Sequence, residues 1–395
     1  MMIPYGYKQT EVGVIPEDWE CVKIKDVATI SMCKRIFANQ TSTIGDVPFY
    51  KIGTFGKEAD AYISSKLYVE YRNKYSFPQK GDILISAAGT LGRTVVYDGE
   101  KAYFQDSNIV WLDINKTRLC NEYLNQYYKV IKWASSEGST IARLYNGIIY
   151  ATYISLPPLQ EQQRIAEALS DVDGMISSLE KLIAKYKSIK TACLQQMFPQ
   201  NGETVPRMRL PGFTGAWEQR KVSELFRVTR GYVLAATQTE TTKTDEKPYP
   251  VYSSQTKDKG LMGYYKDYLY EDAITWTTDG ANAGTVNYRA GKFYCTNVCG
   301  VLLSNEVKAN QMIAEALNSV AKGYVSYVGN PKLMNNVMAD IAIQIPTQAE
   351  EREQLSSFFA KLDNLITLHQ RKLEKIQKIK QGMMQQLLTG KIRLV

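Results

Sequence analysis

Residues 156–190 read LPPLQEQQRIAEALSDVDGMISSLEKLIAKYKSIK, and residues 345–380 read IPTQAEEREQLSSFFAKLDNLITLHQRKLEKIQKIK. In both stretches apolar side chains recur at alternating intervals of four and three residues, the spacing of a helix that packs against another helix. The spacing predicts two long helices, each with one seam. The seam positions are Ile165, Leu169, Val172, Ile176, Leu179 and Ile183 in the first stretch, and Leu355, Phe359, Leu362, Ile366, His369 and Leu373 in the second.

The second stretch repeats the first. Leu355 follows Ile165 by 190 residues, and the later seam positions keep this offset. Each stretch is predicted to form a helix of about 39 residues, over 160–198 and 350–388, with a length of about 58 Å. A helix this long with an apolar seam needs a partner, so we expect the two helices to pair with each other as an antiparallel coiled coil.

The repeat extends beyond the helices. DWECVKIKDVA (18–28) reappears as AWEQRKVSELF (216–226), and residues 81–114 resemble residues 272–305. Each of these longer stretches has a β-branched run, a glycine-rich turn and two further strand-like segments. Just before each helix, ARLYNG and PKLMNN place Arg143 opposite Lys332.

The predicted fold is therefore mixed α/β with an internal pseudo-twofold repeat. A globular domain precedes each long helix, and shorter helices are expected near 120–135 and 309–321. The proline- and glycine-rich linker 199–215 cannot continue the first long helix. The four predicted segments are 1–155 (first globular domain), 156–200 (central helix), 201–344 (second globular domain) and 345–395 (terminal helix).

Composition excludes some classes of protein and leaves others open. With 44% hydrophobic and 22% charged residues, the 395-residue chain has the composition of an ordinary globular protein. No run of about 18 uncharged apolar residues and no signal-like start is present, so we expect a cytoplasmic protein without a membrane partner. The net charge of +8 is spread over the four segments and does not by itself establish nucleic-acid binding.

Cysteine and histidine usage argues against a metal or catalytic centre. The six cysteines are scattered except for one C-x-x-x-C, whereas a zinc site needs about four ligands at short paired spacings. The single histidine, His369, is a seam residue that sets register or contacts a partner helix rather than a ligand or catalyst. We therefore predict free thiols, no metal ligands and no catalytic residues.

Three stretches carry a family resemblance. They are LPPLQEQQRIAEALSDVDGMI (156–176), the pairing of TGAWEQRKVSELF (214–226) with IPEDWECVKIKDVA (15–28), and the terminal QQLLTGKIRLV (385–395). Over its whole length the chain resembles the specificity subunit of bacterial type I restriction-modification systems. The second helix departs from the pattern, because IPTQAEEREQL has one extra residue before the helix.

The resemblance implies a sequence-specific, non-catalytic subunit that binds double-stranded DNA. Each globular domain would be a target-recognition domain that reads one half of a bipartite asymmetric site. The two helices would set the spacing and dock two modification subunits, which carry S-adenosylmethionine and methylate adenine N6. Restriction subunits would add an ATP- and Mg-dependent endonuclease, while this chain would bind no cofactor itself.

A different class of function also fits the pattern of two domains and two helices. The chain could be a two-headed coiled-coil adaptor that binds proteins and reads no DNA. Salt dependence separates these interpretations, because DNA affinity falls steeply as salt rises. Since each globular domain has a net charge of only +2, we expect the isolated chain to bind DNA weakly.

Loops that differ between the two globular domains are the candidate base-reading elements. Arginine and lysine can bind guanine O6 and N7, and asparagine and glutamine can pair with adenine N6 and N7. For any single residue, a solvated surface role is the alternative. The candidates are Lys34, Arg35, Asn39, Gln40, Lys51, Thr54 and Lys57 in the first domain, and Arg230, Tyr232, Gln238, Thr239, Ser253, Ser254, Gln255 and Lys257 in the second.

Features shared by both globular domains are candidates for sequence-independent phosphate contacts. Arg143 and Lys332 match across the repeat, with a salt bridge at the helix entrance as the alternative. The glycine-rich turns AAGTLGRT (87–94), which includes Arg93, and TDGANAGT (278–285) also occur in both domains. These turns indicate either hairpin geometry that favours glycine or close approach of the backbone to phosphate.

Overall fold

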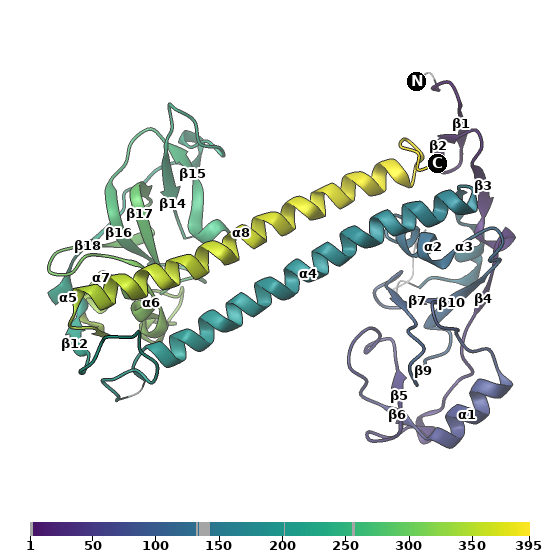
Figure 1. The fold of residues 1–395 in the computed structure, drawn as a ribbon, viewed down its shortest axis with the longest axis horizontal. Helices are drawn as coiled ribbons and strands as arrows, with labels where there is room; N and C mark the ends of the chain where they lie inside the picture. The colour runs from purple at the N-terminus through teal and green to yellow at the C-terminus, as the bar shows by residue number, and fades with distance from the viewer. Residues whose placement is uncertain (1–2, 132, 134–142, 201, 255–256) are drawn as a thin grey trace. The chain divides into compact units, whose positions relative to one another are not determined.

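The computed structural model describes residues 3–131, 133, 143–200, 202–254 and 257–395. These residues form two compact units. Unit 1 comprises Met1–Ser178 with Leu373–Val395, and unit 2 comprises Leu179–Lys372. Each unit therefore combines one globular domain with parts of both long helices (Figure 1).

The globular part of unit 1 contains a central antiparallel sheet and a smaller sheet beside it. The central sheet has the order β4-β10-β7-β8, and the smaller one has the order β6-β5-β9, in which β5 and β9 are parallel. The elements are β1 (Tyr7–Thr10), β2 (Gly13–Pro16), β3 (Glu20–Lys23), β4 (Ala28–Ser31), β5 (Val47–Tyr50), β6 (Tyr62–Ile63), α1 (Ser65–Lys74), β7 (Ile83–Ser86), β8 (Thr94–Val96), β9 (Tyr103–Phe104), β10 (Ile109–Ile114), α2 (Asn121–Tyr128), α3 (Asn146–Ala151) and β11 (Tyr153–Leu156).

The globular part of unit 2 is built around one six-stranded sheet. Its order is β13-β18-β16-β17-β14-β15, and only the β14–β17 pair among these described strands is parallel. The elements are β12 (Glu218–Lys221), α5 (Val222–Leu225), β13 (Phe226–Arg230), β14 (Tyr249–Tyr252), β15 (Leu261–Tyr265), β16 (Tyr270–Thr277), β17 (Val286–Cys295), β18 (Cys299–Ser304), α6 (Gln311–Val320), α7 (Asn335–Asp340) and β19 (Ala342–Ile345).

The two sheets confirm the internal repeat. In unit 1, β7 pairs with β10 and β8, as β16 pairs with β18 and β17 in unit 2. The parallel pairs also correspond, because Tyr50 lies opposite Phe104 and Tyr252 lies opposite Cys295. Helices α2 and α6 each contribute buried residues to the main core of their unit. The two expected short helices are therefore present.

The two long helices are α4 (Leu159–Met197) and α8 (Ala349–Leu387), each 39 residues long. Both begin one residue earlier than predicted. Their first turns contain Glu161 and, in α8, Glu350 and Glu351, which the positive end of a helix dipole favours.

Within each unit the long helices run antiparallel. In unit 1, Asp173 of α4 forms an ion pair with Lys380 of α8. In unit 2, Tyr186 stacks on His369 with ring centroids 5.6 Å apart, and Lys190 lies 2.7 Å from Asp363. Residue numbers thus fall along α8 as they rise along α4, which confirms the predicted antiparallel pairing (Figure 1).

Part of the seam packs against the globular cores, because Ile165 and Leu169 belong to the main core of unit 1, and Leu355, Phe359 and Leu362 belong to that of unit 2. His369 stacks on Tyr186, and its Nδ1 has no hydrogen-bond partner among the described residues. The buried seam residues are Ile165, Leu169, Val172, Leu179 and Ile183 of α4 and Leu355, Phe359, Leu362 and Ile366 of α8, while Ile176, His369 and Leu373 are half-buried. Among the described residues, no helix combines the length and apolar character needed to cross a membrane.

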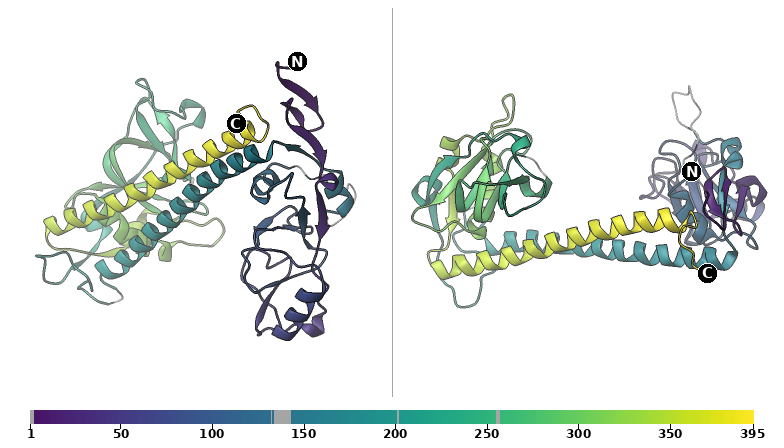
Figure 2. Two further views of the ribbon diagram at one scale, coloured as in Figure 1. Left: turned by 45° about the vertical axis from the view of Figure 1, so that its right-hand side comes forward. Right: turned by 90° about the horizontal axis from the view of Figure 1, so that it is seen from above.

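The C-terminal residues pack against the start of the chain in unit 1 (Figure 2). Arg393 lies 2.8 Å from Glu161 and 2.6 Å from Asp18. The indole Nε1 of Trp19 also donates to Glu161, at 3.0 Å. Unit 2 contains the equivalent ion pair between Arg209 and Glu351, at 2.7 Å. The internal repeat therefore extends to the segment that follows each long helix.

Asp363 is expected to make the stability of unit 2 depend on pH. Burial opposes ionisation of its carboxyl group, but Lys190 and Lys259 outweigh that effect and hold its pKa below the usual value. A lowered pKa adds stability above the unfolded-state pKa, about 3.9, which is lost as pH falls through the folded-state pKa. In pH-dependent unfolding, Asp363→Asn should therefore lose less stability between about pH 5 and 2 than the wild type. Parallel curves for the two proteins would contradict this.

Candidate nucleic-acid interface

In unit 1, the loop after β4 carries four of the predicted residues. The ammonium of Lys34 lies over the ring of Tyr75, 5.1 Å from its centroid, and Arg35 forms a 2.8 Å ion pair with Asp106. The side chain of Gln40 accepts a hydrogen bond from the amide of Phe37 at 2.9 Å, so it supports the turn Ala38–Gln40. Asn39, in the same turn, is exposed.

The loop after β5 contains the other base-reading candidates of this domain. Lys51 forms a 2.9 Å ion pair with Asp60, and the hydroxyl of Thr54 accepts a hydrogen bond from the amide of Lys51 at 3.1 Å. Lys57 is exposed and lines a cavity of about 260 Å³ with Tyr50 and Phe104. Thr54 thus has a local structural role, while Lys57 is accessible.

Residues 105–107, directly after β9, bring these loops together. Gln105 accepts a hydrogen bond from the amide of Ile52 at 2.9 Å, and Asp106 binds Arg35. Arg143 donates to the carbonyl of Ser107 at 3.4 Å. One short segment, residues 105–107, therefore contacts three parts of the chain: Arg35, Arg143 and the loop that begins at Lys51. We call the loops after β4 and β5, together with residues 105–107 and Arg143, the unit 1 loop cluster.

In unit 2, Thr296, directly after β17, contacts the corresponding loops. The amide of Thr296 donates to the carbonyl of Tyr252 at 2.9 Å, as Gln105 does to Tyr50. Its hydroxyl donates to Ser253 at 2.9 Å. The amide of Tyr232 donates to the carbonyl of Cys295 at 3.1 Å. The loops after β13 and β14 thus meet here and form the unit 2 loop cluster.

The remaining predicted residues of unit 2 lie in or beside these loops. Arg230, Tyr232 and Gln238 are exposed, and Thr239 uses its hydroxyl to donate to the carbonyl of Ala236 at 2.8 Å. The carbonyl of Ser254 accepts from Asn282 at 3.0 Å. Lys257 begins the turn η4 (Lys257–Gly260). Gln255 lies outside the described residues.

The shared candidates Arg143 and Lys332 occupy equivalent backbone positions. Arg143 forms a single β-bridge with Ala88, and Lys332 forms one with Asp279, so each bridges to the glycine-rich turn of its own unit. Lys332 also lies 4.0 Å from the carboxylate of Asp279, which supports the salt-bridge alternative for this residue. Arg93 donates to the carbonyl of Phe55 at 3.0 Å.

Hairpin geometry favours glycine at two positions of these turns. Gly92 has a φ of +73°, a conformation that favours glycine, and a Cβ atom there would lie 2.6 Å from the indole nitrogen of Trp133. Gly284 has a φ of +80°. The backbone requirement is therefore sufficient to account for the glycines at these two positions.

Two features of the interface are not apparent from the sequence. Large apolar side chains are exposed in the loops after β4 and β13, including Phe37 in unit 1 and Val233, at 78%, in unit 2. Arg289 of β17 is buried below the unit 2 loop cluster, although most buried positions of a strand are apolar. Only the difference between the two repeats, YDG in one and YRA in the other, hints at Arg289 in the sequence.

Comparison with known proteins gives consistent results. The model of the type I restriction modification DNA specificity domain matches residues 16–189 and again residues 215–378. A type I restriction enzyme specificity subunit of Haemophilus influenzae is 53% identical over 175 residues, which cover 44% of this chain and 46% of that protein. The MjaX specificity subunit of Methanocaldococcus jannaschii is 24% identical over 98% of this chain and 97% of its own length.

A solved structure supports the fold. The crystal structure of the type I restriction-modification system S subunit from M. genitalium has a TM-score of 0.70. The alignment covers 93% of this chain and 96% of that one, at 14% sequence identity. At this level of identity the similarity concerns the fold.

Proposed function

The chain belongs to the family of the type I restriction modification DNA specificity domain, and from this membership we propose that it is the DNA-reading subunit of a modification complex. Each globular domain reads one half of a bipartite asymmetric site in double-stranded DNA. The chain itself supplies no catalytic group.

One observation carries this proposal. The two loop clusters have the same backbone plan, anchored by Gln105 in unit 1 and Thr296 in unit 2, but they present different side chains. The unit 1 loop cluster presents Lys34, Arg35 and Asn39, whereas the unit 2 loop cluster presents Tyr232, Gln238 and Ser253. A common scaffold with different polar side chains suits recognition of two different base sequences by hydrogen bonds to base edges.

Positively charged residues in equivalent positions suit contacts to the DNA backbone. Arg143 and Lys332 bridge to corresponding turns, and such shared contacts would orient each domain on the duplex without reading bases. The exposed apolar side chains of Phe37 and Val233 are suited to contact sugar and base edges in a groove.

We further propose that the long helices bind two modification subunits. Both helices keep apolar side chains on their solvent faces, including Met175 of α4 at 48% and Leu368 of α8 at 61% exposure. Exposed apolar residues of this size on a helix are suited to protein contacts. In the assembled enzyme, the modification subunits carry S-adenosylmethionine for adenine N6 methylation, and restriction subunits carry the ATP and Mg chemistry.

Methylation of a host genome tests this function. Co-expression of the chain with a cognate modification subunit, in a host without DNA methylation, should give N6-methyladenine in a split motif with a fixed gap. Replacing residues 28–144 by the same region of a relative should change only one half of that motif. This boundary retains Trp19 and the contacts of the C-terminal residues with the start of the chain.

The control separates assembly from recognition. The exchanged protein must still bind the modification subunit and retain the unchanged half of the motif. A motif altered in both halves, or an assembled complex that binds S-adenosylmethionine and methylates no defined sequence, would reject the proposed division of labour.

A further inference from the structure

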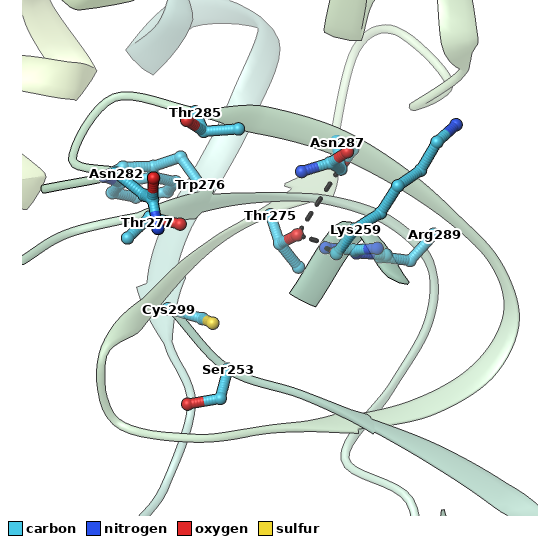
Figure 3. A pocket seen from close by; sticks show the side chains of 10 residues that line it. All are labelled: Ser253, Lys259, Thr275, Trp276, Thr277, Asn282, Thr285, Asn287, Arg289 and Cys299. Carbon is cyan, nitrogen blue, oxygen red and sulfur yellow. Dashed lines mark hydrogen bonds between the residues drawn. The ribbon is translucent and has the colours of Figure 1, made fainter. Parts of the chain in front are cut away.

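Unit 2 contains a polar cavity of about 230 Å³ beside its loop cluster (Figure 3). It lies between β14, η4 and the strands β16, β17 and β18. Two of its lining residues, Lys259 and Arg289, carry positive charge, and none of the residues that line it carries a carboxylate. The ammonium of Lys259 pairs with Asp363, so Arg289 supplies the unpaired positive charge of the cavity, beside several hydrogen-bonding groups. The other lining residues are Ser253, Thr275, Trp276, Thr277, Asn282, Thr285, Asn287 and Cys299.

Arg289 is held rigidly in the wall of this cavity. Its Nε donates to the hydroxyl of Thr275 at 3.0 Å, and its Nη2 donates to the carbonyl of Lys259 at 2.7 Å. The guanidinium carbon lies 3.7 Å from the ring centroid of Tyr252, a cation–π contact. Only 6% of the residue is exposed. Figure 3 shows the guanidinium beside Thr275 and Asn287.

The charge of Arg289 is not neutralised within the described part of the chain. Its hydrogen-bond acceptors there are a hydroxyl and a carbonyl, and neither carries a charge. Burial consequently lowers the pKa of its guanidinium. A buried cation without a negative partner is unfavourable, and an anion in the cavity would relieve that cost.

The same positions of the unit 1 sheet are apolar. The strand registers pair Thr275 with Asn287 in unit 2 and Leu84 with Val95 in unit 1. Arg289 lies two residues after Asn287, and Tyr97 lies two residues after Val95, so these two positions correspond. Tyr97 belongs with Leu84 to an apolar cluster. Unit 1 also has a cavity beside Val95 and Tyr97, but Asp98 and Glu100 line it together with Lys57 and Lys101. A buried cation in a wall without carboxylates is thus a feature of unit 2, and it points to an anionic ligand.

The turn next to Arg289 is also unusual. Asp258 and Lys259 have φ angles of +50° and +53°, which are uncommon for residues other than glycine. The backbone of Lys259 accepts the hydrogen bond from Arg289, and its ammonium lies 3.1 Å from Asp363 of α8. Contacts on both sides therefore hold this turn at the cavity.

We propose that the cavity around Arg289 binds a phosphate group, which in the DNA-bound protein is a backbone phosphate of the half-site read by unit 2. A planar guanidinium flanked by hydroxyl and amide groups matches phosphate oxygens in charge and geometry. The cavity adjoins Ser253 of the unit 2 loop cluster, so a duplex held there would be close. The DNA source rests on the proposed function, whereas phosphate binding itself does not. A free phosphate ester has the same chemistry.

The first experiment uses the full chain and inorganic phosphate, without DNA. Thermal unfolding is compared in phosphate and in chloride at equal ionic strength, with hydrogen exchange in β16 and β17 as a local readout. A hundredfold excess of phosphate over its dissociation constant should raise the wild-type midpoint by about 5 °C. Arg289→Met should show no such shift, while Arg227→Met, which removes an exposed arginine of β13, should behave as the wild type.

Thermal unfolding in chloride shows whether a substitution of Arg289 disturbs folding. Arg289→Met should unfold in chloride no earlier than the wild type, because it removes an unneutralised buried charge. Arg289→Lys keeps the charge but loses the planar fork, so it should retain only part of the phosphate effect.

The second experiment distinguishes the source of the phosphate. In the complex with modification subunits, Arg289→Met should weaken binding to all duplexes similarly and reduce the salt slope by about 1. If phosphate raises the unfolding midpoint of the wild type but Arg289→Met leaves the salt slope of DNA binding unchanged, the cavity binds a free phosphate ester. Equal phosphate responses of wild type and Arg289→Met, with an unchanged slope, would overturn the proposal. The methylation motif is read separately, so failure of this site and failure of DNA recognition are distinguishable.

Discussion

Replacing Phe359 with alanine is expected to destabilise unit 2 by about 3–5 kcal/mol, the range for removing a fully buried aromatic side chain. Phe359 is 0% exposed, and its ring lies 5.6 Å from that of Phe198, so it joins α8 to the end of α4 and to the main core of unit 2. Hydrogen exchange of α6 and β19 amides should report the loss as faster opening.

A matched control lies on the same helix. Leu368→Ala removes a side chain that is 61% exposed, so the free energy of unfolding should change by less than about 0.5 kcal/mol. The amides of unit 1 strands such as β10 should be unaffected by either change. A loss below about 1 kcal/mol for Phe359→Ala would mean that the seam near Phe359 is not tightly packed.

Replacing Arg209 with methionine should cost unit 2 about 3–5 kcal/mol, since it leaves a buried carboxylate without its cation. Glu351 is 0% exposed and receives two parallel hydrogen bonds from Arg209, at 2.8 and 2.7 Å. The same arginine also donates to the carbonyl of Gly215, so its loss should release the linker before β12. Denaturant unfolding measures the cost, and hydrogen exchange locates it.

A double variant separates the cost of an unpaired charge from the value of the pair. Adding Glu351→Gln to Arg209→Met should recover a large part of the stability, because replacing both partners of a buried ion pair is often nearly neutral. The exposed Arg207 provides the matched single control, Arg207→Met, with little expected effect. No recovery in the double variant would show that the loss of side-chain packing, rather than of charge, determines the effect.

Local sequence patterns predicted the helices, the repeat and the fold class. The alternating spacing of the seam placed both long helices within one residue of their observed bounds. Such a pattern is readable because the helical period brings residues four and three apart onto one face without any information from the rest of the chain. The repeat was equally local, since it required only comparison of two stretches of one sequence.

Proximity of the candidate loops could not be read from the sequence. Arg35, Lys51 and Arg143 are far apart along the chain, and only the parallel pairing of β5 with β9 and the segment after β9 bring their loops together. The sequence likewise did not show that Gln40 and Thr54 support their own turns. Such roles depend on contacts made after the chain has folded.

Strand register alone decided the position of Arg289. Aligned residue for residue, the two repeats place Arg289 opposite the exposed Asp98. In unit 2 the amide of Thr277 donates a hydrogen bond to the carbonyl of Thr285, which closes the glycine-rich turn. In unit 1 the corresponding bond runs from the amide of Ser86 to the carbonyl of Arg93. The unit 2 turn is therefore one residue longer than the unit 1 turn. A shift of one residue moves a side chain to the other face of a strand. The sequence by itself determined the helices and the repeat, but only tertiary pairing turned Arg289 inward.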